Sequence, residues 1–243
     1  LRKILKKYRP SSIISFLPQS NIISLISSVS LNCRVIVSER NSLRDQNLSC
    51  FWRLARKISY RNSTYVTVNS DALKKEVFRE IGCQAVKVSN LIEVPDTSEL
   101  PCNREKLVLS VGRIVKQKGF DLLLRGFALT RARANGWKLC IVGDGPILLD
   151  LKKLAKDLEL ADSVVWVGLT ADVQTWYKKS QLFILVSRYE GTSNAMLEAM
   201  SWSLPVIVSN TSGGAIEIIR DGENGIIVSL DTVEIASKID HMI

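Results

Sequence analysis

The sequence has 243 residues, of which 46% are hydrophobic and 23% charged, with 33 basic and 24 acidic residues, one His and five Cys. This apolar content excludes a disordered chain, and the length suits one large domain or two small ones. An odd number of scattered cysteines without a CxxC pair argues against a disulfide framework or a zinc site and favours a reducing cytoplasm. The single His disfavours a His-based triad or metal site. No stretch reaches the roughly 18 uninterrupted apolar residues of a membrane span.

The excess positive charge lies entirely in the first part of the chain. Residues 1–106 contain 18 basic and 9 acidic residues, whereas residues 107–243 contain 15 of each. The excess is concentrated in Leu1–Pro10 and Trp52–Arg61. It indicates either a solvated basic face or attraction to lipid headgroups, phosphates or nucleic acid. No aromatic-interleaved basic motif accompanies it, so we do not expect a nucleic-acid partner.

In the first part, hydrophobic patterning predicts short strands alternating with helices. The predicted strands are Ser12–Phe16, Arg34–Ser38 and Tyr65–Val68, and the predicted helices lie near Asn21–Ser30, Cys50–Tyr60 and Ser70–Ile81. Pro95, Pro101 and several charges, without clear periodicity, then indicate a linker. We therefore predict a partial first lobe over residues 1–95, a linker over 96–106 and a complete second lobe over 107–243.

The second part alternates short apolar runs with longer segments of helical period. The predicted strands are Leu107–Val111, Lys138–Val142, Val164–Val167, Leu182–Val186, Pro205–Ser209 and Gly225–Val228. The predicted helices are Gly119–Arg133, Pro146–Leu158, Val173–Ser180, Ser193–Trp202 and Ala215–Arg220. This alternation is typical of an α/β fold with a parallel sheet covered on both faces. Such sheets bind ligands at the carboxyl ends of their strands.

The loop after the first strand of this second part carries two cations. Gly112 allows a tight exit from the strand, and Arg113 and Lys118 follow in the strand-to-helix loop. Arg by bidentate bonding and Lys as a point charge can converge on a diphosphate. The alternative is a pair of solvated loop residues.

A second strand-to-helix turn contains Gly143, Asp144, Gly145 and Pro146. The dinucleotide pattern GxGxxG fails because Leu148 occupies the third glycine position. Pro146 suits the first position of a helix. The turn either lets backbone approach a ligand or is purely structural.

Most polar candidates are concentrated in the segment 187–200. Glu190 follows a strand, Gly191 relaxes the turn, and Thr192 or Ser193 suits a helix N-cap. Free amide groups and the positive dipole end of that helix form an anion site. Glu198 lies further into the helix, so that the two carboxylates can bracket a ligand. The alternative is a capped helix with two surface acids.

The order of these segments resembles the nucleotide-sugar-binding lobe of family 4 glycosyltransferases, which are retaining enzymes of the GT-B fold. The resemblance covers residues 107–243 through the runs SVGRxxxQKGFD, VGDGP, SRYEG…LEAM, LPVIVS, GGAIEII and DGENG. In the first part, four runs are similar to members that build polyprenyl-diphosphate-linked or surface glycans, including lipopolysaccharide: ISFL at 14–17, NI at 21–22, VSERN at 37–41 and SN at 89–90. The resemblance implies two Rossmann-like parallel-sheet lobes, the first incomplete.

The resemblance also implies roles for individual residues. Arg113 and Lys118 match the pair that neutralises the donor diphosphate, and Glu190 matches the acid facing the donor sugar; these three are the catalytic candidates. Glu198 matches the acid that binds the ribose hydroxyls. The remaining donor-binding candidates are Gly112, Gly143, Gly145, Gly191, Thr192, Ser193 and Asn194.

The implied activity is transfer of a sugar from a UDP- or GDP-sugar to a glycan or polyprenyl-diphosphate-linked acceptor, with retention and without a metal or other cofactor. The implied location is the cytoplasm, peripheral to the inner membrane face. Two alternatives stay open: a non-catalytic or degenerate nucleotide-sugar-binding module, and a related GT-B epimerase.

The sequence departs from the family pattern in its first part. Arg40 stands where many relatives carry a His, and it is a candidate contact for acceptor or phosphate. The family's glycine-rich loop near the N-terminus is missing, so we expect an N-terminally truncated fragment with little or no activity alone.

The segment around residues 51–61 suggests an interfacial membrane helix. Its apolar members are Phe51, Trp52, Leu54, Ala55 and Ile58, flanked by Arg53, Arg56, Lys57 and Arg61. The alternative is an ordinary surface helix whose apolar side faces the core.

Overall fold

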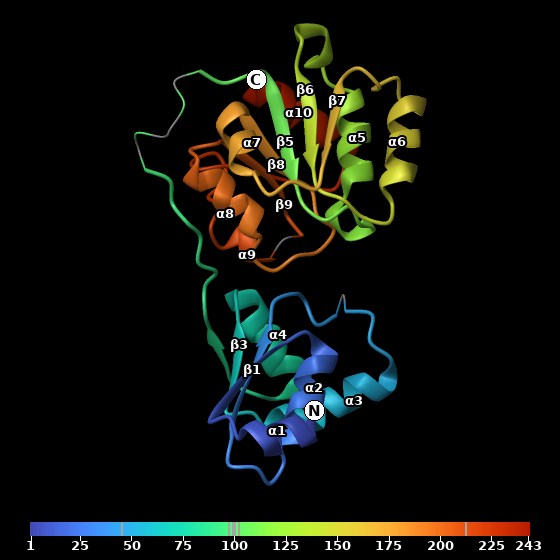
Figure 1. The fold of residues 1–243 in the computed structure, drawn as a ribbon. Coiled ribbons are helices and arrows are strands. Elements are labelled where there is room, and N and C mark those ends of the chain that lie inside the picture. Colours follow the sequence, from blue (N-terminus) through green and yellow to red (C-terminus); the bar gives the residue numbers. More distant parts are fainter. Residues whose placement is uncertain (45, 97, 99–100, 102, 212) are drawn as a thin grey trace. The chain divides into compact units, whose positions relative to one another are not determined.

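The computed structural model describes residues 1–44, 46–96, 98, 101, 103–211 and 213–243. The chain forms two compact units, Leu1–Asn90 and Leu91–Ile243 (Figure 1). The predicted linker, residues 96–106, falls at the start of the second unit, and four of its residues lie outside the described part. The predicted linker and lobe boundaries stay a prediction.

Within the described residues, the first unit holds a parallel sheet of four strands in the order β1-β2-β3-β4. The strands are β1 (Ser12–Phe16), β2 (Arg34–Glu39), β3 (Tyr65–Val68) and β4 (Ala85–Lys87). The helices are α1 (Arg2–Tyr8), α2 (Pro18–Ser28), α3 (Cys50–Ser59) and α4 (Asp71–Ile81). Patterning did not predict α1 and β4. Strand β4 has only three residues, and α1 buries only Leu5, so neither shows a period.

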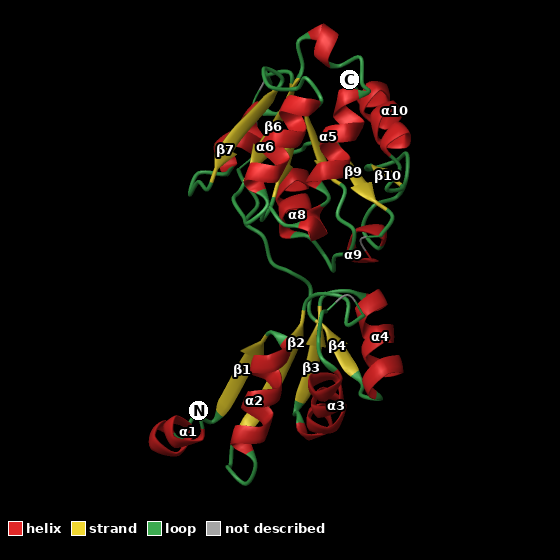
Figure 2. Cartoon of the chain, turned by 90° about the vertical axis from the view of Figure 1, so that its right-hand side faces the viewer, coloured by secondary structure: helices red, strands yellow, loops and turns green. Residues whose placement is uncertain are grey.

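The helices that connect these strands lie on one face of the sheet (Figures 1 and 2). On that face, Val37 and Val66 are buried in a core that the helices share. Side chains on the opposite face stay exposed, with Ile14 at 64% and Tyr65 at 55%. The four-stranded sheet is thus covered on one side within this unit, whereas parallel sheets are commonly covered on both.

The second unit contains, among the described residues, a parallel sheet of six strands in the order β10-β9-β8-β5-β6-β7. The strands are β5 (Leu107–Val111), β6 (Lys138–Val142), β7 (Val164–Gly168), β8 (Leu182–Leu185), β9 (Val206–Ser209) and β10 (Ile226–Val228). All six were predicted to within one residue at each end. The chain winds outward in one direction from β5 and in the other from β8, so the order reverses between these two strands. This is the doubly wound Rossmann arrangement.

Helices cover both faces of this sheet (Figures 1 and 2). They are α5 (Phe120–Ala128), α6 (Leu148–Asp157), α7 (Gln174–Lys179), α8 (Asn194–Ser201), α9 (Gly213–Ile216) and α10 (Thr232–Met242). Alternate strand residues enter two separate cores, as the pleat requires. One core contains Ile184 with side chains of α5, α6 and α10, and the other contains Leu185 with side chains of α7, α8 and α9.

Three predicted helix boundaries in this unit are wrong for local reasons. Helix α5 ends at Ala128, where the Thr130 hydroxyl donates to the Phe127 carbonyl and the chain turns. Helix α6 begins at Leu148, so Pro146 lies in the preceding turn and not at the first helical position. Helix α9 spans Gly213–Ile216 and ends before the predicted Arg220. The predicted glycine loop before α9 includes Ser212, which lies outside the described residues.

Candidate functional site

The candidate residues of the second unit lie at the carboxyl edge of its sheet. Gly112 and Arg113 follow β5, the turn with Gly143 and Gly145 follows β6, and Glu190 follows β8. Because the strands are parallel, these loops all leave the same edge. Ligands of open parallel sheets bind at this edge, where the strand order reverses, and here that point lies between β5 and β8.

The glycines after β5 and β6 bring the two loops together backbone to backbone. A Cβ atom on Gly143, which has φ +141°, would lie 2.0 Å from the Gly112 carbonyl oxygen. A Cβ on Gly145 would lie 2.2 Å from the Ile114 carbonyl oxygen. The Ile114 amide also donates to the Asp144 carbonyl at 2.8 Å. The close approach of the two loops therefore requires glycine at these positions, so the turn has a structural role whether or not its backbone also approaches a ligand.

The same glycines also border a cavity of about 520 Å³. Its lining comes from the ends of β5 and β6 and from the loops that follow β5, β6 and β7, namely Val111, Gly112, Arg113, Val142, Gly143, Asp144, Gly145, Leu169, Thr170 and Val173. Arg113 is exposed at this cavity, and no described residue bonds its side chain. The cavity thus combines an apolar wall, exposed backbone and an unpaired cation.

Lys118 and Glu190 form an ion pair between the loop after β5 and the loop after β8. Their side chains are 15% and 11% exposed, so water screens the pair only partly. The Lys118 chain passes over Gly112, where a Cβ would lie 3.3 Å from the lysine Cε. The Ser187 hydroxyl donates to the second oxygen of Glu190 at 2.9 Å. The structure therefore joins two of the predicted catalytic residues directly.

A second ion pair fixes the two loops that carry the first. Arg188 bonds both carboxylate oxygens of Asp121, at 2.8 and 2.6 Å, and donates to the Lys116 carbonyl at 2.6 Å. The Gln117 amide donates to the Tyr189 carbonyl at 2.9 Å. Gly119, with φ +70°, lets the two loops approach this closely. Any larger residue would place its Cβ 2.0 Å from the Val186 carbonyl oxygen.

Sequence reasoning assigned no role to Arg188 or Asp121. Partial burial raises the pKa of Asp121, but the hydrogen bonds and charge of Arg188 outweigh burial and hold that pKa below its ordinary value. The hydrogen bonds that Arg188 donates to Asp121 raise the pKa of Arg188. Asp121 and Arg188 lie within the runs SVGRxxxQKGFD and SRYEG, and this was the signal available in the sequence.

Helix α8 begins next to Glu190. Its N-cap is Ser193, as predicted, yet the Ser193 side chain makes no capping hydrogen bond. Gly191 is buried and Asn194 is exposed. Thr192 lies against α9, since a Cβ on Gly214 would sit 2.2 Å from its hydroxyl oxygen. The positive end of α8 thus begins a few residues after Glu190 in the chain, and the Ser193 side chain does not cap it.

Glu198 projects from α8 and is held by a buried tyrosine. The Tyr177 hydroxyl lies 2.9 Å from a Glu198 carboxylate oxygen and 3.3 Å from the Ala195 carbonyl oxygen. Tyr177 is 1% exposed, and burial followed by the charge of Glu198 raises its pKa well above the ordinary value. The tyrosine therefore remains a neutral donor that fixes one oxygen of Glu198.

Arg40 belongs to the first unit, at the carboxyl end of its own sheet. Its guanidinium donates to the Ser38 hydroxyl at 2.9 Å and to the Asn90 side-chain oxygen at 2.7 Å, and it lies over the Phe16 ring at 5.9 Å. These contacts give the cation a fixed position at the end of β1, β2 and the segment after β4. Its suggested role toward acceptor or phosphate stays a prediction.

Beneath Arg40, a buried network surrounds Glu39, which is 1% exposed. The Tyr60 hydroxyl donates to one Glu39 oxygen, and the Gln46 amide donates to the other at 2.8 Å. Arg56 donates to the Gln46 oxygen at 2.7 Å. Burial raises the pKa of Glu39, although the hydrogen bonds from Tyr60 and Gln46 act in the opposite direction.

The predicted interfacial segment forms α3, but its side chains divide between two sides. Trp52 and Ala55 pack against the core of the first unit, and Arg56 is buried in the Glu39 network. Phe51, Leu54 and Ile58 are exposed. One side of the helix thus faces the core, as in the alternative, and a second apolar stripe faces outward. The interfacial membrane role stays a prediction.

Three general features concern the described residues as a whole. Cys33, Cys50, Cys83 and Cys140 are free, and Cys102 lies outside the described part. Among the described residues, no group of three or more His, Cys, Asp or Glu is placed to hold a metal ion. No described helix has the length and apolar character that a membrane crossing requires.

Comparison with known families decides the family. The model of the family described as "Glycosyl transferases group 1" matches residues 105–243, more than half of the chain. The chain belongs to the group 1 glycosyl transferases. The glycosyltransferase class expected from the motifs SRYEG…LEAM and QKG is thereby confirmed.

Relatives of this group 1 glycosyl transferase match nearly its whole length. An uncharacterised glycosyltransferase of Haemophilus influenzae is 28% identical over 240 residues, covering 96% of this chain and 67% of the relative. A Campylobacter jejuni α-1,4-N-acetyl-D-galactosaminyltransferase, named for a diNAcBac-PP-undecaprenol-linked acceptor, is 28% identical over 248 residues, covering 99% and 67%. The chain therefore spans about two thirds of the length of these relatives.

The fold of this glycosyl transferase is also found in solved structures. Anabaena HepE in complex with UDP and glucose matches with a TM-score of 0.88 at 18% identity, covering 98% of this chain and 70% of HepE. At this identity the likeness establishes the fold alone. The predicted GT-B fold, with two Rossmann-like parallel sheets, is confirmed.

Proposed function

We propose that this glycosyltransferase moves a sugar from a UDP- or GDP-sugar to a glycan or polyprenyl-diphosphate-linked acceptor, with retention of the anomeric configuration. The observation that best supports this proposal is the Lys118–Glu190 ion pair, which lies where the strand order of the second sheet reverses. A cation and a carboxylate held together at a ligand-binding edge suit a substrate that has a diphosphate joined to a sugar.

The diphosphate is the leaving group of such a transfer, and its negative charge grows as the bond to the sugar breaks. Lys118 exchanges its contact with Glu190 for a phosphate oxygen, and Arg113 approaches from the open cavity. Amide groups at the start of α8, from Gly191 to Asn194, hold the distal phosphate. Cations and a helix terminus directed at the diphosphate stabilise its developing charge. In this proposal they take the place of a metal ion, and no cofactor is required.

Release of Lys118 leaves the Glu190 carboxylate facing the donor sugar. Ser187 continues to hold one of its oxygens, so the carboxylate keeps its orientation while the other oxygen meets a sugar hydroxyl. Glu190 thus positions the sugar over the diphosphate.

The nucleoside part of the donor fits the remaining features. Glu198, fixed by Tyr177, offers carboxylate oxygens to the two ribose hydroxyls. The cavity of about 520 Å³ has apolar walls from Leu169 and Val173 and exposed backbone at Gly143, which suits a planar base. Both uracil and guanine present hydrogen-bonding edges to such backbone groups.

We further propose that the acceptor is a lipid-linked or surface glycan, of the kind assembled into lipopolysaccharide or related glycoconjugates. The name of the Campylobacter relative specifies an undecaprenyl-diphosphate-linked glycan as its acceptor. The free cysteines are consistent with a cytoplasmic location. No observation favours an epimerase or a non-catalytic module.

Two measurements test the proposal together. Thermal-shift screening of UDP- and GDP-sugars identifies the donor, since a ligand that binds the folded chain raises its melting temperature. Because the chain spans about two thirds of its relatives' length, transfer with that donor is then followed in the intact enzyme, unchanged and with Glu190→Ala. We expect the variant to lose about a thousandfold in transfer while it still binds the nucleotide.

The matched control is Glu223→Ala, which removes a carboxylate from an exposed turn of the same unit. It should leave transfer unchanged. Normal turnover by Glu190→Ala, or equal losses in both variants, would contradict the role proposed for Glu190.

A further inference from the structure

Arg104 lies just before β5 and contacts two helices that come much later in the chain. One terminal nitrogen of its guanidinium donates to the carbonyls of Tyr177 and Ser180, both at 2.8 Å. The other donates to the Trp202 carbonyl at 2.6 Å. The first two carbonyls belong to the end of α7 and the third to the end of α8. A single side chain therefore joins the C-terminal ends of both helices, and we call these three hydrogen bonds the Arg104 bridge.

The ends of these helices suit a cation. Carbonyls in the last turn of a helix lack intrahelical partners and lie at the negative end of the helix dipole. The last turn of α8 contains no basic residue of its own, so Arg104 supplies the cation from another part of the chain. The planar fork of a guanidinium serves several acceptors at fixed angles, whereas an ammonium is a compact point charge.

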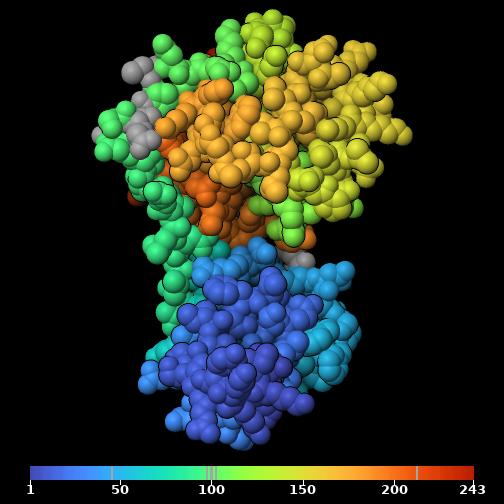
Figure 3. Space-filling model, in the orientation of Figure 1, coloured from blue at the N-terminus to red at the C-terminus, as the bar shows by residue number. Residues whose placement is uncertain are grey.

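The backbone at Arg104 is itself fixed against the end of α7. The Gln181 side chain donates to the Arg104 carbonyl at 2.9 Å, and the Glu105 amide donates to the Lys179 carbonyl at 2.7 Å. The segment that leads into β5 accordingly runs beside α7 (Figures 1 and 3). Arg104 is partly buried there. Its guanidinium thus extends from a backbone that hydrogen bonds hold in place.

The Arg104 bridge completes a closed ring of contacts through Glu198. The Tyr177 hydroxyl donates to a Glu198 carboxylate oxygen at 2.9 Å, and the Trp202 amide donates to the Glu198 carbonyl at 3.1 Å. Arg104 closes the ring because it bonds the carbonyls of both Tyr177 and Trp202. These two side chains are 1% and 4% exposed, so close packing restricts their movement. The position of the Glu198 carboxylate therefore depends on Arg104 as well as on Tyr177.

We propose that Arg104 is a positioning residue for the donor site, which keeps Glu198 in place for the ribose hydroxyls. The inference rests on the proposed function, because that function assigns the ribose to Glu198. Arg104 acts through Tyr177 and does not touch the substrate. Without the Arg104 bridge, the ends of α7 and α8 are free to shift against each other. Hydrogen bonds weaken steeply with distance and angle, so the contact with the ribose suffers more than the rest of the nucleotide.

The preference for a ribonucleotide over a deoxynucleotide measures this role. UDP or GDP, whichever binds, is titrated into the intact enzyme, and its 2′,3′-dideoxy analogue is titrated separately. The unchanged enzyme should prefer the ribonucleotide by about tenfold or more, as expected for hydrogen bonds to a charged group. Arg104→Gln should reduce this preference to about threefold or less. A merely structural role would weaken both ligands equally and leave the preference unchanged, and that result would overturn the proposal.

Two further variants locate the effect. Glu198→Gln should itself lower the preference, and adding Arg104→Gln to it should lower the preference no further. An equal fall caused by Arg104→Gln in both backgrounds would show that Arg104 acts by another route. Arg104→Lys covers the case in which Arg104→Gln does not fold. It keeps the charge but not the fork that reaches both helices, so the preference should fall here too, and a full preference would contradict the bridging role.

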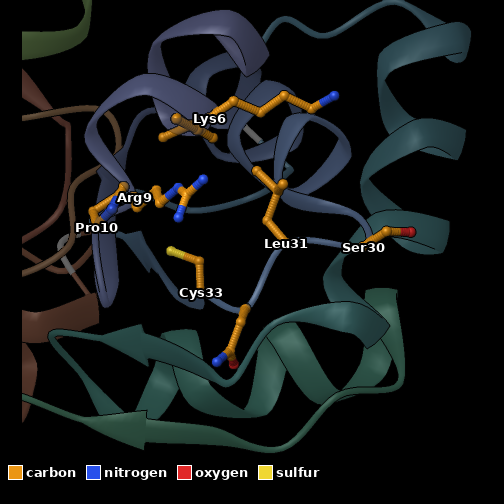
Figure 4. Close-up of a pocket in the computed structure, with 8 residues that line it drawn as sticks. Lys6, Arg9, Pro10, Ser30, Leu31 and Cys33 are labelled. Atoms are coloured by element: carbon orange, nitrogen blue, oxygen red, sulfur yellow. The ribbon is translucent and has the colours of Figure 1, made fainter.

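Two other arginines serve as matched controls. Arg133 also donates to a carbonyl just beyond a helix, that of Glu159 after α6, at 2.6 Å. Arg9 belongs to the first unit, where it lines a cavity of about 360 Å³ (Figure 4). Neither helix α6 nor this cavity carries a residue of the proposed donor site. Arg133→Gln and Arg9→Gln should therefore keep the full preference, and a fall as large as that of Arg104→Gln would count against the proposal.

Hydrogen exchange tests the Arg104 bridge without any ligand. Arg104→Gln should speed exchange by about tenfold or more in the last turns of α7 and α8, but not in α10. Unchanged exchange in both helices would refute the bridge, whatever the enzyme binds. A preference lost in Glu198→Gln but kept in Arg104→Gln would refute the positioning role and leave the proposed function intact. An unchanged enzyme without any preference for ribose would instead contradict the ribose role of Glu198 and, with it, the role of Arg104.

Discussion

Arg188 and Asp121 join the two loops that present Lys118 and Glu190. Arg188 bonds both oxygens of the Asp121 carboxylate and also the Lys116 carbonyl, so it holds the turn that precedes α5 against the segment that follows β8. The pair is partly shielded from water, with side chains 26% and 32% exposed. We therefore expect the pair to hold Lys118 and Glu190 in place for the proposed reaction.

We predict that Arg188→Gln strongly lowers the rate of transfer but lowers the free energy of unfolding only slightly. Without the bidentate contact the two loops separate, and transfer should fall by about tenfold to a hundredfold. The free energy of unfolding should fall by only about 1 kcal/mol, because the pair is not deeply buried. Steady-state kinetics and urea unfolding measure the two effects. A double-mutant cycle with Asp121→Asn should show that the losses are not additive, and additive losses would argue against a shared role.

The Arg188–Asp121 pair should also give stability a defined dependence on pH. The pKa of Asp121 lies below its ordinary value of 3.8 in the folded chain. The pair therefore contributes fully above that value, and its contribution is lost as pH falls through the folded pKa. Urea unfolding of the unchanged chain and of Asp121→Asn should differ at pH 6 and converge as the pH falls below 3.8 through the folded pKa. A difference that persists unchanged in acid would contradict this.

Tyr177→Phe should weaken donor binding because it frees the Glu198 carboxylate to rotate. We expect the Kd for the nucleotide to rise by about fivefold to tenfold, the loss of one hydrogen bond to a charged group. Isothermal titration with the nucleotide measures it. Glu198→Gln should weaken binding further, and adding Tyr177→Phe to it should change little. An equal effect of Tyr177→Phe in both backgrounds would show that the tyrosine acts by another route.

Glycine substitutions separate backbone strain from close packing. Gly119 and Gly136 have nearly the same conformation, with φ of +70° and +77°, but a Cβ would meet the Val186 carbonyl only at Gly119. Gly136→Ala should cost about 1 kcal/mol in the free energy of unfolding, as expected for strain alone. Gly119→Ala should cost at least about 2 kcal/mol more, because two backbone segments must move apart. Equal costs would show that the close packing of Gly119 against Val186 adds nothing to the cost of the substitution.

Glu39 should make the chain less stable as pH rises. Burial raises its pKa above the ordinary value of 4.5, so the folded chain keeps a proton that the unfolded chain has lost. Stability should fall between pH 4.5 and the folded pKa, and Glu39→Gln should remove this part of the dependence. Thermal melting of both chains across mildly acidic to neutral pH measures it. If the melting temperatures of the two chains changed with pH in the same way, the prediction would be contradicted.

Much of the second unit could be predicted from sequence because its strands are short apolar runs bounded by glycine turns. The run Leu107–Val111 and the helix after Ser193 carry signals that depend on neighbouring residues alone. Strand β4 and helix α1 were missed because they are too short to show a period. Strand β4 has three residues and is recognised by its hydrogen-bonded pairing with β3, which its own sequence does not reveal.

The site was predictable as a set of residues but not as a set of contacts. Lys118 and Glu190 were both singled out, yet their pairing depends on the adjacency of β5 and β8, strands separated by more than seventy residues of chain. Arg188 and Tyr177 were missed for the same reason, because each acts through a distant partner. The two sides of α3 could not be distinguished either, since both carry apolar residues.

The most direct test of the central claim compares a nucleotide with its nucleoside. The claim is that Lys118 and Arg113 hold a diphosphate, so UDP or GDP, whichever binds, is titrated together with uridine or guanosine. Lys118→Gln and Arg113→Gln should each weaken nucleotide binding by about tenfold or more and leave nucleoside binding unchanged. Lys116→Gln, an exposed cation of the same turn, serves as the control and should change neither. If the two variants bind the nucleotide as tightly as the control does, these residues do not form a diphosphate site and the account is wrong.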